Sequence, residues 1–145
     1  MIAYADTGFL VSLYSQDSHS LIASTLIRSS KPTFILTPLG ETEFTNALQL
    51  RVFRKEWASR DARLVRESFE QHQAAGVFRR EPLSVEVWEK ALSLSRRRTA
   101  RLGTRTLDLL HVAAAVVFAP DVFYTFDVRQ RTLAHAERLR VRPDR

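Results

Sequence analysis

The chain has 145 residues, 45% of them hydrophobic and 26% charged, which indicates one globular domain over residues 1–145 and excludes a disordered or fibrous protein. The absence of cysteine excludes disulfides, thiolate metal sites and cysteine nucleophiles. Nineteen arginines and three lysines against sixteen acidic residues give a formal net charge of +6, which favours an anionic partner such as nucleic acid. The longest apolar run, 112–119, is too short to cross a bilayer and the start lacks a basic signal region, so we expect a cytoplasmic protein without a membrane partner.

The first half of the chain alternates β-rich runs with helical patterns. We expect strands at 2–5 and 33–37 and helices at 9–14, 20–28, 38–54 and 59–75. Pro38 stops the second strand and opens the helix that follows it, because proline fits the first helical position. Gly76 marks the end of the fourth helix.

The second half continues the same alternation. We expect strands at 77–80, 122–125 and, as a last edge strand, 139–141, with helices at 84–98, 106–119 and 128–139. Parallel neighbouring strands need crossover connections, so strands separated by helices predict an α/β fold with a parallel sheet and helices on both faces. Ligands bind such sheets beyond the carboxyl ends of the strands, so residues that directly follow strands are the candidates for function.

Four carboxylates occur in otherwise apolar or β-rich surroundings. Asp6 and Asp127 each follow a strand, and Asp108 lies at the start of the apolar helix 106–119. Glu43 shares a helical stripe with apolar residues and is expected to point toward the sheet. Taken singly, each aspartate is explained as a helix cap or a complement to the helix dipole.

Taken together, the four carboxylates would repel one another if the sheet brought them to one place, so a cluster of them needs a cation. Oxygen ligands without cysteine or paired histidines suit Mg²⁺ or Mn²⁺. A divalent ion of this kind lowers the pKa of a bound water and neutralises charge on phosphoryl oxygens, which indicates hydrolysis of a phosphodiester.

The whole sequence resembles the PIN-domain ribonucleases of the VapC toxin type. The motifs that carry the resemblance are ADTGFLVSLY, ETEFTNAL, RTLDLLHVAAAV and YTFDVRQRTLA. The acidic positions of the family fall on Asp6, Glu43, Asp108 and Asp127. At position 8 the chain has glycine where the family often has alanine or another small residue.

This resemblance implies a sheet of order 3-2-1-4-5, with Asp6 and Asp127 on adjacent strands beside the point where strand order reverses. It also implies dependence on Mg²⁺ or Mn²⁺, an RNA substrate, products with 5′-phosphate and 3′-hydroxyl ends, a homodimer and inhibition by a protein antitoxin. Thr7 and Thr125 occupy positions where the family has small hydroxyl residues beside the acidic site, and Asn46 lies one helical turn from Glu43, so we expect these three to support the acids. Local hydroxyl bonds in turns are the alternative for both threonines.

Several basic residues and one histidine precede or follow Asp108. Four arginines are candidates for contact with the RNA backbone: Arg97, Arg98, Arg101 and Arg105. The alternative is a solvated helix end that the helix dipole favours. We expect His111 to be a packed histidine bonded to the backbone, since Mg²⁺ prefers oxygen ligands.

The sequence therefore predicts a Mg²⁺-dependent endoribonuclease, the toxin of a type II toxin–antitoxin pair, with Asp6, Glu43, Asp108 and Asp127 as metal ligands and catalytic residues. Two alternatives remain open at this point. One is a PIN-like nuclease that acts in RNA processing or on DNA. The other is an RNA-binding module without catalysis, in which the acids only cap helices.

Overall fold

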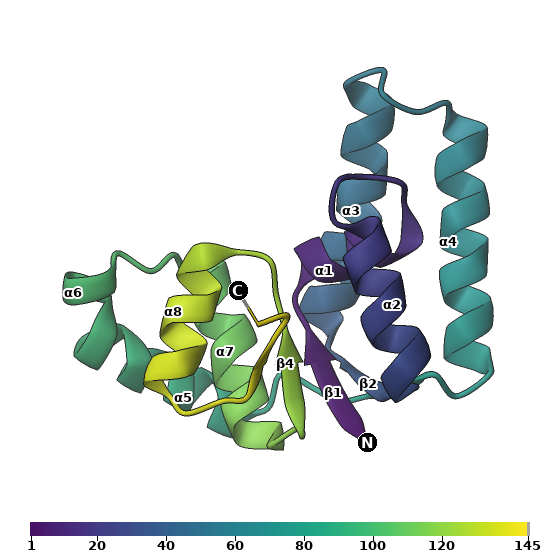
Figure 1. The fold of residues 1–145 in the computed structure, drawn as a ribbon. Coiled ribbons are helices and arrows are strands. Elements are labelled where there is room, and N and C mark those ends of the chain that lie inside the picture. Colours follow the sequence, from purple (N-terminus) through teal and green to yellow (C-terminus); the bar gives the residue numbers. More distant parts are fainter. Residues whose placement is uncertain (145) are drawn as a thin grey trace.

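The protein is built around a parallel sheet of five strands in the order β3-β2-β1-β4-β5, as predicted (Figure 1). The computed structural model describes residues 1–144. The strands are β1 (Ile2–Ala5), β2 (Thr33–Leu36), β3 (Phe78–Arg80), β4 (Val122–Tyr124) and β5 (Val141–Arg142). Because the chain adds β2 and β3 on one side of β1 and then β4 and β5 on the other, the strand order reverses between β1 and β4.

Helices connect all these strands and lie close to their predicted bounds. They are α1 (Thr7–Tyr14), α2 (Ser20–Ser30), α3 (Pro38–Phe53), α4 (Ser59–Ala74), α5 (Val85–Leu94), the π-helix η1 (Ser95–Thr99), α6 (Ala100–Leu102), α7 (Thr106–Phe118) and α8 (Val128–Ala136). No helix of the described chain is long and apolar enough to span a membrane.

Two helix ends differ from the sequence-based expectation. The segment after Ser84 is α-helical only to Leu94 and continues as a π-helix and a short α-helix to the left-handed Gly103. Helix α8 ends at Ala136, earlier than expected, because Arg138 adopts a positive φ of 62° and turns the chain toward β5.

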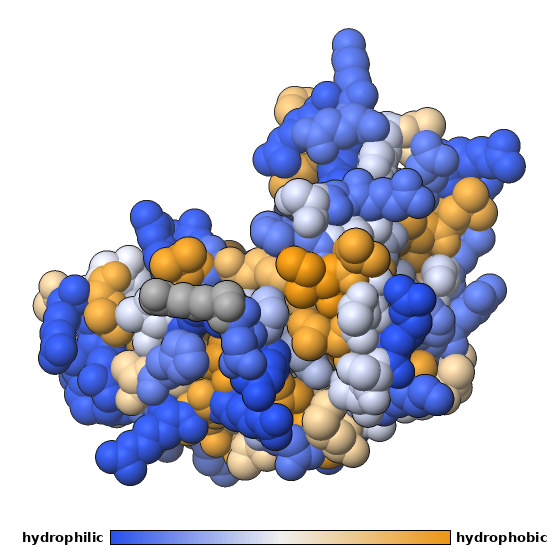
Figure 2. Space-filling view, viewed as in Figure 1, coloured by the Kyte–Doolittle hydropathy of each residue, from blue (hydrophilic) through white to orange (hydrophobic). Residues whose placement is uncertain are grey.

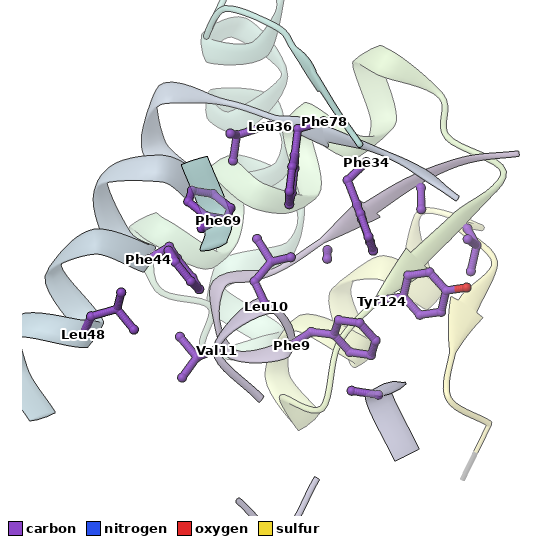
Figure 3. Close-up of a cluster of buried hydrophobic side chains, with 14 of the residues drawn as sticks. Phe9, Leu10, Val11, Phe34, Leu36, Phe44, Leu48, Phe69, Phe78 and Tyr124 are labelled. Carbon is purple, nitrogen blue, oxygen red and sulfur yellow. The ribbon is translucent and has the colours of Figure 1, made fainter. Parts of the chain in front are cut away.

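Alternate residues of each strand point to opposite faces of the sheet and build two separate cores. Ala3 and Ala5 pack on one face with α1–α4, whereas Tyr4 packs on the other with α5, α7 and α8. The first core is rich in aromatic rings, of which Figure 3 shows Phe9, Phe34, Phe44, Phe69 and Phe78. The buried residues of the second core include Leu94, Val112, Phe123, Leu133 and Val141.

Helices α3 and α4 pack side by side and project beyond the sheet as a two-helix arm (Figure 1). In the space-filling view a hollow separates this arm from the part of the molecule that contains α8 (Figure 2). The carboxyl ends of β1 and β4 point toward this hollow (Figure 1). The fold therefore leaves open the edge of the sheet at which the sequence places Asp6 and Asp127.

Candidate active site

Asp6 is the most buried carboxylate of the candidate site, with 1% of its surface exposed. It lies between β1 and α1 and caps the helix, because its Oδ1 accepts the backbone N–H of Phe9 at 2.7 Å. Its Oδ2 accepts a hydrogen bond from the Thr125 hydroxyl, which follows β4. Asp6 is thus a helix cap, as the sequence predicted for each aspartate taken singly, and it is also bonded to the residue that follows the neighbouring strand.

Burial raises the pKa of Asp6, and the bonds from Thr125 and from the Phe9 N–H oppose this rise. Removing the ionised carboxylate from water costs free energy that two hydrogen bonds only partly offset. A cation beside Asp6 would recover this free energy. Such a carboxylate is typical of a functional site more than of a structural cap, which is normally open to solvent.

Glu43 points from α3 toward the sheet, as its helical stripe predicted. Its Oε1 accepts a hydrogen bond from the Thr7 hydroxyl at 2.9 Å and another from Nε2 of His111. Burial by itself would raise the pKa of Glu43, but the contacts with His111 and Thr7 outweigh it and lower this pKa below its usual value. Glu43 is therefore held as an anion at the edge of the cavity.

His111 differs from the sequence-based expectation of bonds to the backbone. It is 1% exposed, and its ring joins two side chains, with Nδ1 2.8 Å from the Tyr4 hydroxyl and Nε2 bonded to Glu43. Burial raises the pKa of Tyr4, so its hydroxyl keeps its proton and can donate to Nδ1, which leaves Nε2 as the donor to Glu43. A lone histidine in an apolar helix gives no sign of this role, because Tyr4 and Glu43 are distant in the sequence.

Asp108 and Asp127 lie on the other side of the cavity and share one arginine. Asp108, in the first turn of α7, is buried, and its Oδ2 accepts a hydrogen bond from Nε of Arg105 at 2.9 Å. Asp127 caps α8 by accepting the Gln130 N–H at 2.8 Å, and its Oδ2 lies 3.7 Å from Nη2 of Arg105. The guanidinium of Arg105 thus bridges two carboxylates and offsets part of their mutual repulsion.

All four predicted acids line one cavity of about 390 Å³. Its wall also contains Thr7, Gly8, Arg105, Thr106, Leu107, His111 and Gln130. Gln130 is 7% exposed, and within residues 1–144 its Oε1 has no hydrogen-bond partner. The spacing Asp127-x-x-Gln130 is that of a capping box, but the Asp127 N–H bonds instead to the Thr125 hydroxyl at 2.9 Å, which leaves the Gln130 carboxamide free.

The donor chemistry of this cavity fits a divalent cation, because its acidic ligands are oxygens and a cationic guanidinium already lies between two of them. Across residues 1–144, however, no three acidic or histidine side chains approach closely enough to form a metal-binding cluster. The carboxylates share a cavity, each with partners of its own, and do not form a completed ligand shell. Their assignment as metal ligands stays a prediction.

The other predicted site residues divide into those at the cavity and those away from it. Thr7 and Thr125 contact Glu43 and Asp6, as described, whereas Asn46 is exposed on α3 and lines a separate groove. Of the four arginines predicted to contact RNA, Arg105 lines the cavity and Arg101 is exposed on α6. Arg97 and Arg98 bond to Glu137, which follows α8.

The comparison with known families agrees with this geometry. The family model of the PIN domain matches residues 3–136. The chain belongs to the PIN-domain family. No curated protein matches the sequence of this PIN domain.

Three solved structures share the fold of this PIN domain at low sequence identity. VapC20 of Mycobacterium tuberculosis, described as a toxin that cleaves the sarcin–ricin loop, is 19% identical with a TM-score of 0.67, over 90% of this chain and 93% of that one. FitAcB of Neisseria gonorrhoeae is 16% identical with a TM-score of 0.72, over 97% and 96%. VapBC2 of Rickettsia felis, bound to a promoter DNA fragment, is 13% identical with a TM-score of 0.68, over 98% of each chain.

Proposed function

We propose that this PIN domain is an endoribonuclease that depends on Mg²⁺ or Mn²⁺ and acts as the toxin of a type II toxin–antitoxin pair. One observation carries the proposal: carboxylates from four separate parts of the chain, Asp6, Glu43, Asp108 and Asp127, line one cavity at the carboxyl edge of the sheet. Helix capping accounts for Asp6 and Asp127 but not for Glu43 and Asp108, which do not occupy the N-cap positions of their helices. The solved VapC20 toxin, which shares the fold, supports RNA as the substrate.

Asp6, Glu43, Asp108 and Asp127 are the residues that would hold the cation. When bound, a divalent ion in this cavity supplies an activated water and neutralises charge that develops on the phosphoryl oxygens. The protein contributes the orientation of its ligands, since outer hydrogen bonds of this kind fix ligand carboxylates. Thr125 and the Phe9 N–H fix the Asp6 carboxylate, and Thr7 and His111 fix that of Glu43.

Arg105 is the basic residue best placed to act on substrate. Its side chain is 61% exposed and lines the cavity between Asp108 and Asp127. With Asp108 and Asp127 holding a cation, the guanidinium of Arg105 would be available to contact a phosphate, whose geometry its planar fork matches. The bonds of Arg97 and Arg98 to Glu137 place these two arginines on the α8 side, where they would contact RNA only at a distance from the acids.

The proposal includes a homodimer and a protein antitoxin in the cytoplasm. Three apolar residues lie exposed along one face of α5 at helical spacing: Val85 (71%), Trp88 (49%) and Leu92 (58%). A stripe of this kind is typical of a surface that a second protein covers. The resemblance to VapC toxins supports the antitoxin. Light scattering of the wild type and of Leu92→Arg tests the dimer, which the charge should disrupt.

Cleavage of RNA tests the enzyme. The purified protein should cut total RNA into discrete fragments with Mg²⁺ or Mn²⁺, and excess chelator or the variant Asp6→Asn should abolish the cutting. The variant Glu86→Gln, which neutralises an exposed acid of α5 outside the apolar stripe, serves as the control and should cut normally. Cleavage that resists chelator or survives in Asp6→Asn contradicts the mechanism. Single-stranded and flapped DNA assayed in parallel decide between RNA and DNA, and preferential cutting of DNA contradicts the proposed substrate.

A further inference from the structure

A second groove, of about 480 Å³, borders the acid cavity and shares Asp6, Thr7, Gly8 and Asp127 with it. Beyond these shared residues it runs between the start of α2 and the end of α3. Its remaining wall consists of Val11, Ser12, Asp17, His19, Ala47, Leu50, Arg51, Arg54 and Phe126. The two hollows therefore lie side by side, with these four shared residues between them.

A ladder of four aromatic rings leads from the core to this groove. Tyr124 and Phe9 stack in the core with centroids 4.8 Å apart, as Figure 3 shows. Phe126 stacks on Phe9 at 5.1 Å, and His19 stacks on Phe126 at 4.3 Å with the two rings only 10° from parallel. Phe9 is fully buried and His19 is exposed, so the ladder ends at an exposed imidazole that stacks on Phe126.

The loop before α2 holds His19 in this position. Asp17 accepts hydrogen bonds from the His19 backbone N–H at 2.8 Å and from the Ser12 hydroxyl at 2.9 Å. The Ser20 hydroxyl bonds to the backbone oxygens of Ser12 and Ser15. The His19 side chain itself does not cap α2. This network fixes the backbone of the loop while the ring of His19 is free of any structural hydrogen bond to the helix end.

The opposite wall of the groove is basic. Nη2 of Arg51 lies 3.8 Å from Oδ2 of Asp17, so the charge of Arg51 compensates that of Asp17. The Cζ of Arg51 lies 5.0 Å from the ring centroid of Trp57. Arg54, at the end of α3, is exposed and makes no ion pair within residues 1–144. The groove thus offers a flat aromatic face on one side and a free guanidinium on the other.

We propose that this groove binds one nucleotide of single-stranded RNA next to the scissile phosphate, with its base stacked on His19 and its phosphate at Arg54. The inference rests on the proposed nuclease function and adds a subsite to it. Aromatic faces that stack bases and arginines that contact phosphates are the two elements of single-strand binding, and stacking tolerates any base. A base on His19 extends a stack that is already anchored in the core, so little ordering is required of the protein.

The experiment uses the full chain and an oligoribonucleotide that contains a cleavage site mapped in total RNA. We compare wild type, His19→Ala, His19→Phe and, as the matched control, His135→Ala, which removes an exposed histidine of α8. Each is assayed on the intact oligonucleotide and on versions with one abasic residue placed in turn on either side of the cut. His19→Ala should raise KM about 5- to 100-fold with little change in kcat, which is the range expected for one stacked base.

Three results support the proposal. His19→Phe should restore the wild-type KM, because a phenyl ring also stacks. The abasic position that removes the base stacked on His19 should weaken the affinity of wild type for the oligonucleotide. It should not weaken that of His19→Ala any further, because the variant has already lost the stack. Arg54→Ala should flatten the dependence of log KM on log salt by about 0.7, the value of one phosphate contact on a single strand, whereas Arg60→Ala, on an exposed part of α4, should not.

Two results overturn it, and they are distinct. The proposed subsite is wrong, and the nuclease function stands, if wild type cleaves RNA and His19→Ala has the same KM. The same conclusion follows if the KM of His19→Ala stays above that of wild type on every abasic oligonucleotide. If wild type cleaves no RNA with either metal, the proposed function falls and the subsite falls with it. Unfolding of His19→Ala is measured as well, and its melting temperature should fall only slightly, because the side chain is exposed and its stack on Phe126 is lost.

Discussion

Replacement of Thr125 by valine tests whether the buried Asp6 depends on the hydroxyl that follows β4. Thr125 is fully buried, and its hydroxyl makes two bonds: it donates to Oδ2 of Asp6 and accepts the backbone N–H of Asp127 at 2.9 Å. Valine keeps the branched shape of threonine and has a methyl group in place of the hydroxyl. Serine, the matched control, keeps the hydroxyl and loses a methyl group.

The expected cost follows from these two bonds. A hydrogen bond to a charged acceptor contributes about 1.5–3 kcal/mol, and the bond from the Asp127 N–H about 1 kcal/mol. We therefore expect Thr125→Val to lower the free energy of unfolding of the metal-free protein by about 2–4 kcal/mol. Thr125→Ser should cost about 1 kcal/mol, for the methyl group alone.

Urea unfolding in the presence of chelator measures these losses. The deficit of Thr125→Val should be full above the raised pKa of Asp6 and should shrink as the pH falls through that pKa, because a protonated Asp6 needs its donor less. It should also shrink in the Asp6→Asn background, where the acceptor has lost its charge, and this double-mutant cycle isolates the pair. A Thr125→Val protein as stable as wild type, or a deficit unchanged by Asp6→Asn, would refute the argument that this bond stabilises the buried carboxylate.

Three further outcomes are expected. Burial raises the pKa of Asp6, so the folded state binds this proton more tightly than the unfolded chain, and the ionised carboxylate lowers the free energy of unfolding above that pKa. In chelator, Asp6→Asn should therefore be more stable than wild type at pH 8, and this advantage should disappear on acidification. Urea titrations at several pH values check this prediction. His111→Leu removes a donor to Glu43 and should weaken Mn²⁺ binding, measured by calorimetry, about 10- to 100-fold. Tyr4→Phe, which removes only the partner of Nδ1 of His111, is the graded control and should weaken binding less. Equal Mn²⁺ affinity in His111→Leu and wild type would exclude a positioning role for His111. Arg105→Ala should tighten Mn²⁺ binding only modestly, since solvent screens an exposed ion pair, and Arg105→Lys should leave the affinity unchanged. Weaker Mn²⁺ binding in Arg105→Ala would contradict competition between the guanidinium and the metal.

Local sequence signals determined the order and type of the elements. Period-two and helical patterns, together with Pro38 and Gly76 at element ends, predicted the parallel α/β sheet and nearly all element bounds. These signals depend on interactions between residues close in the chain, so they can be read directly. The same holds for the acids that follow strands, because parallel strands bring their carboxyl ends to one edge.

The partners of each side chain were decided only by the tertiary structure. The expectation that His111 bonds to the backbone was wrong, because β1 and α3 bring Tyr4 and Glu43 to its two nitrogens from distant parts of the chain. Packing likewise leaves Asn46 in a groove away from the acids, although it lies one turn from Glu43.

The ladder of rings that ends at His19 had no signal in the sequence, since its members come from three separate segments. The sequence alone thus predicted which acidic residues line the cavity, because each of them has a local signal in a strand end or a helical stripe. Contacts between residues far apart in the chain depend on how helices pack against the sheet, and this packing is set by the whole core at once.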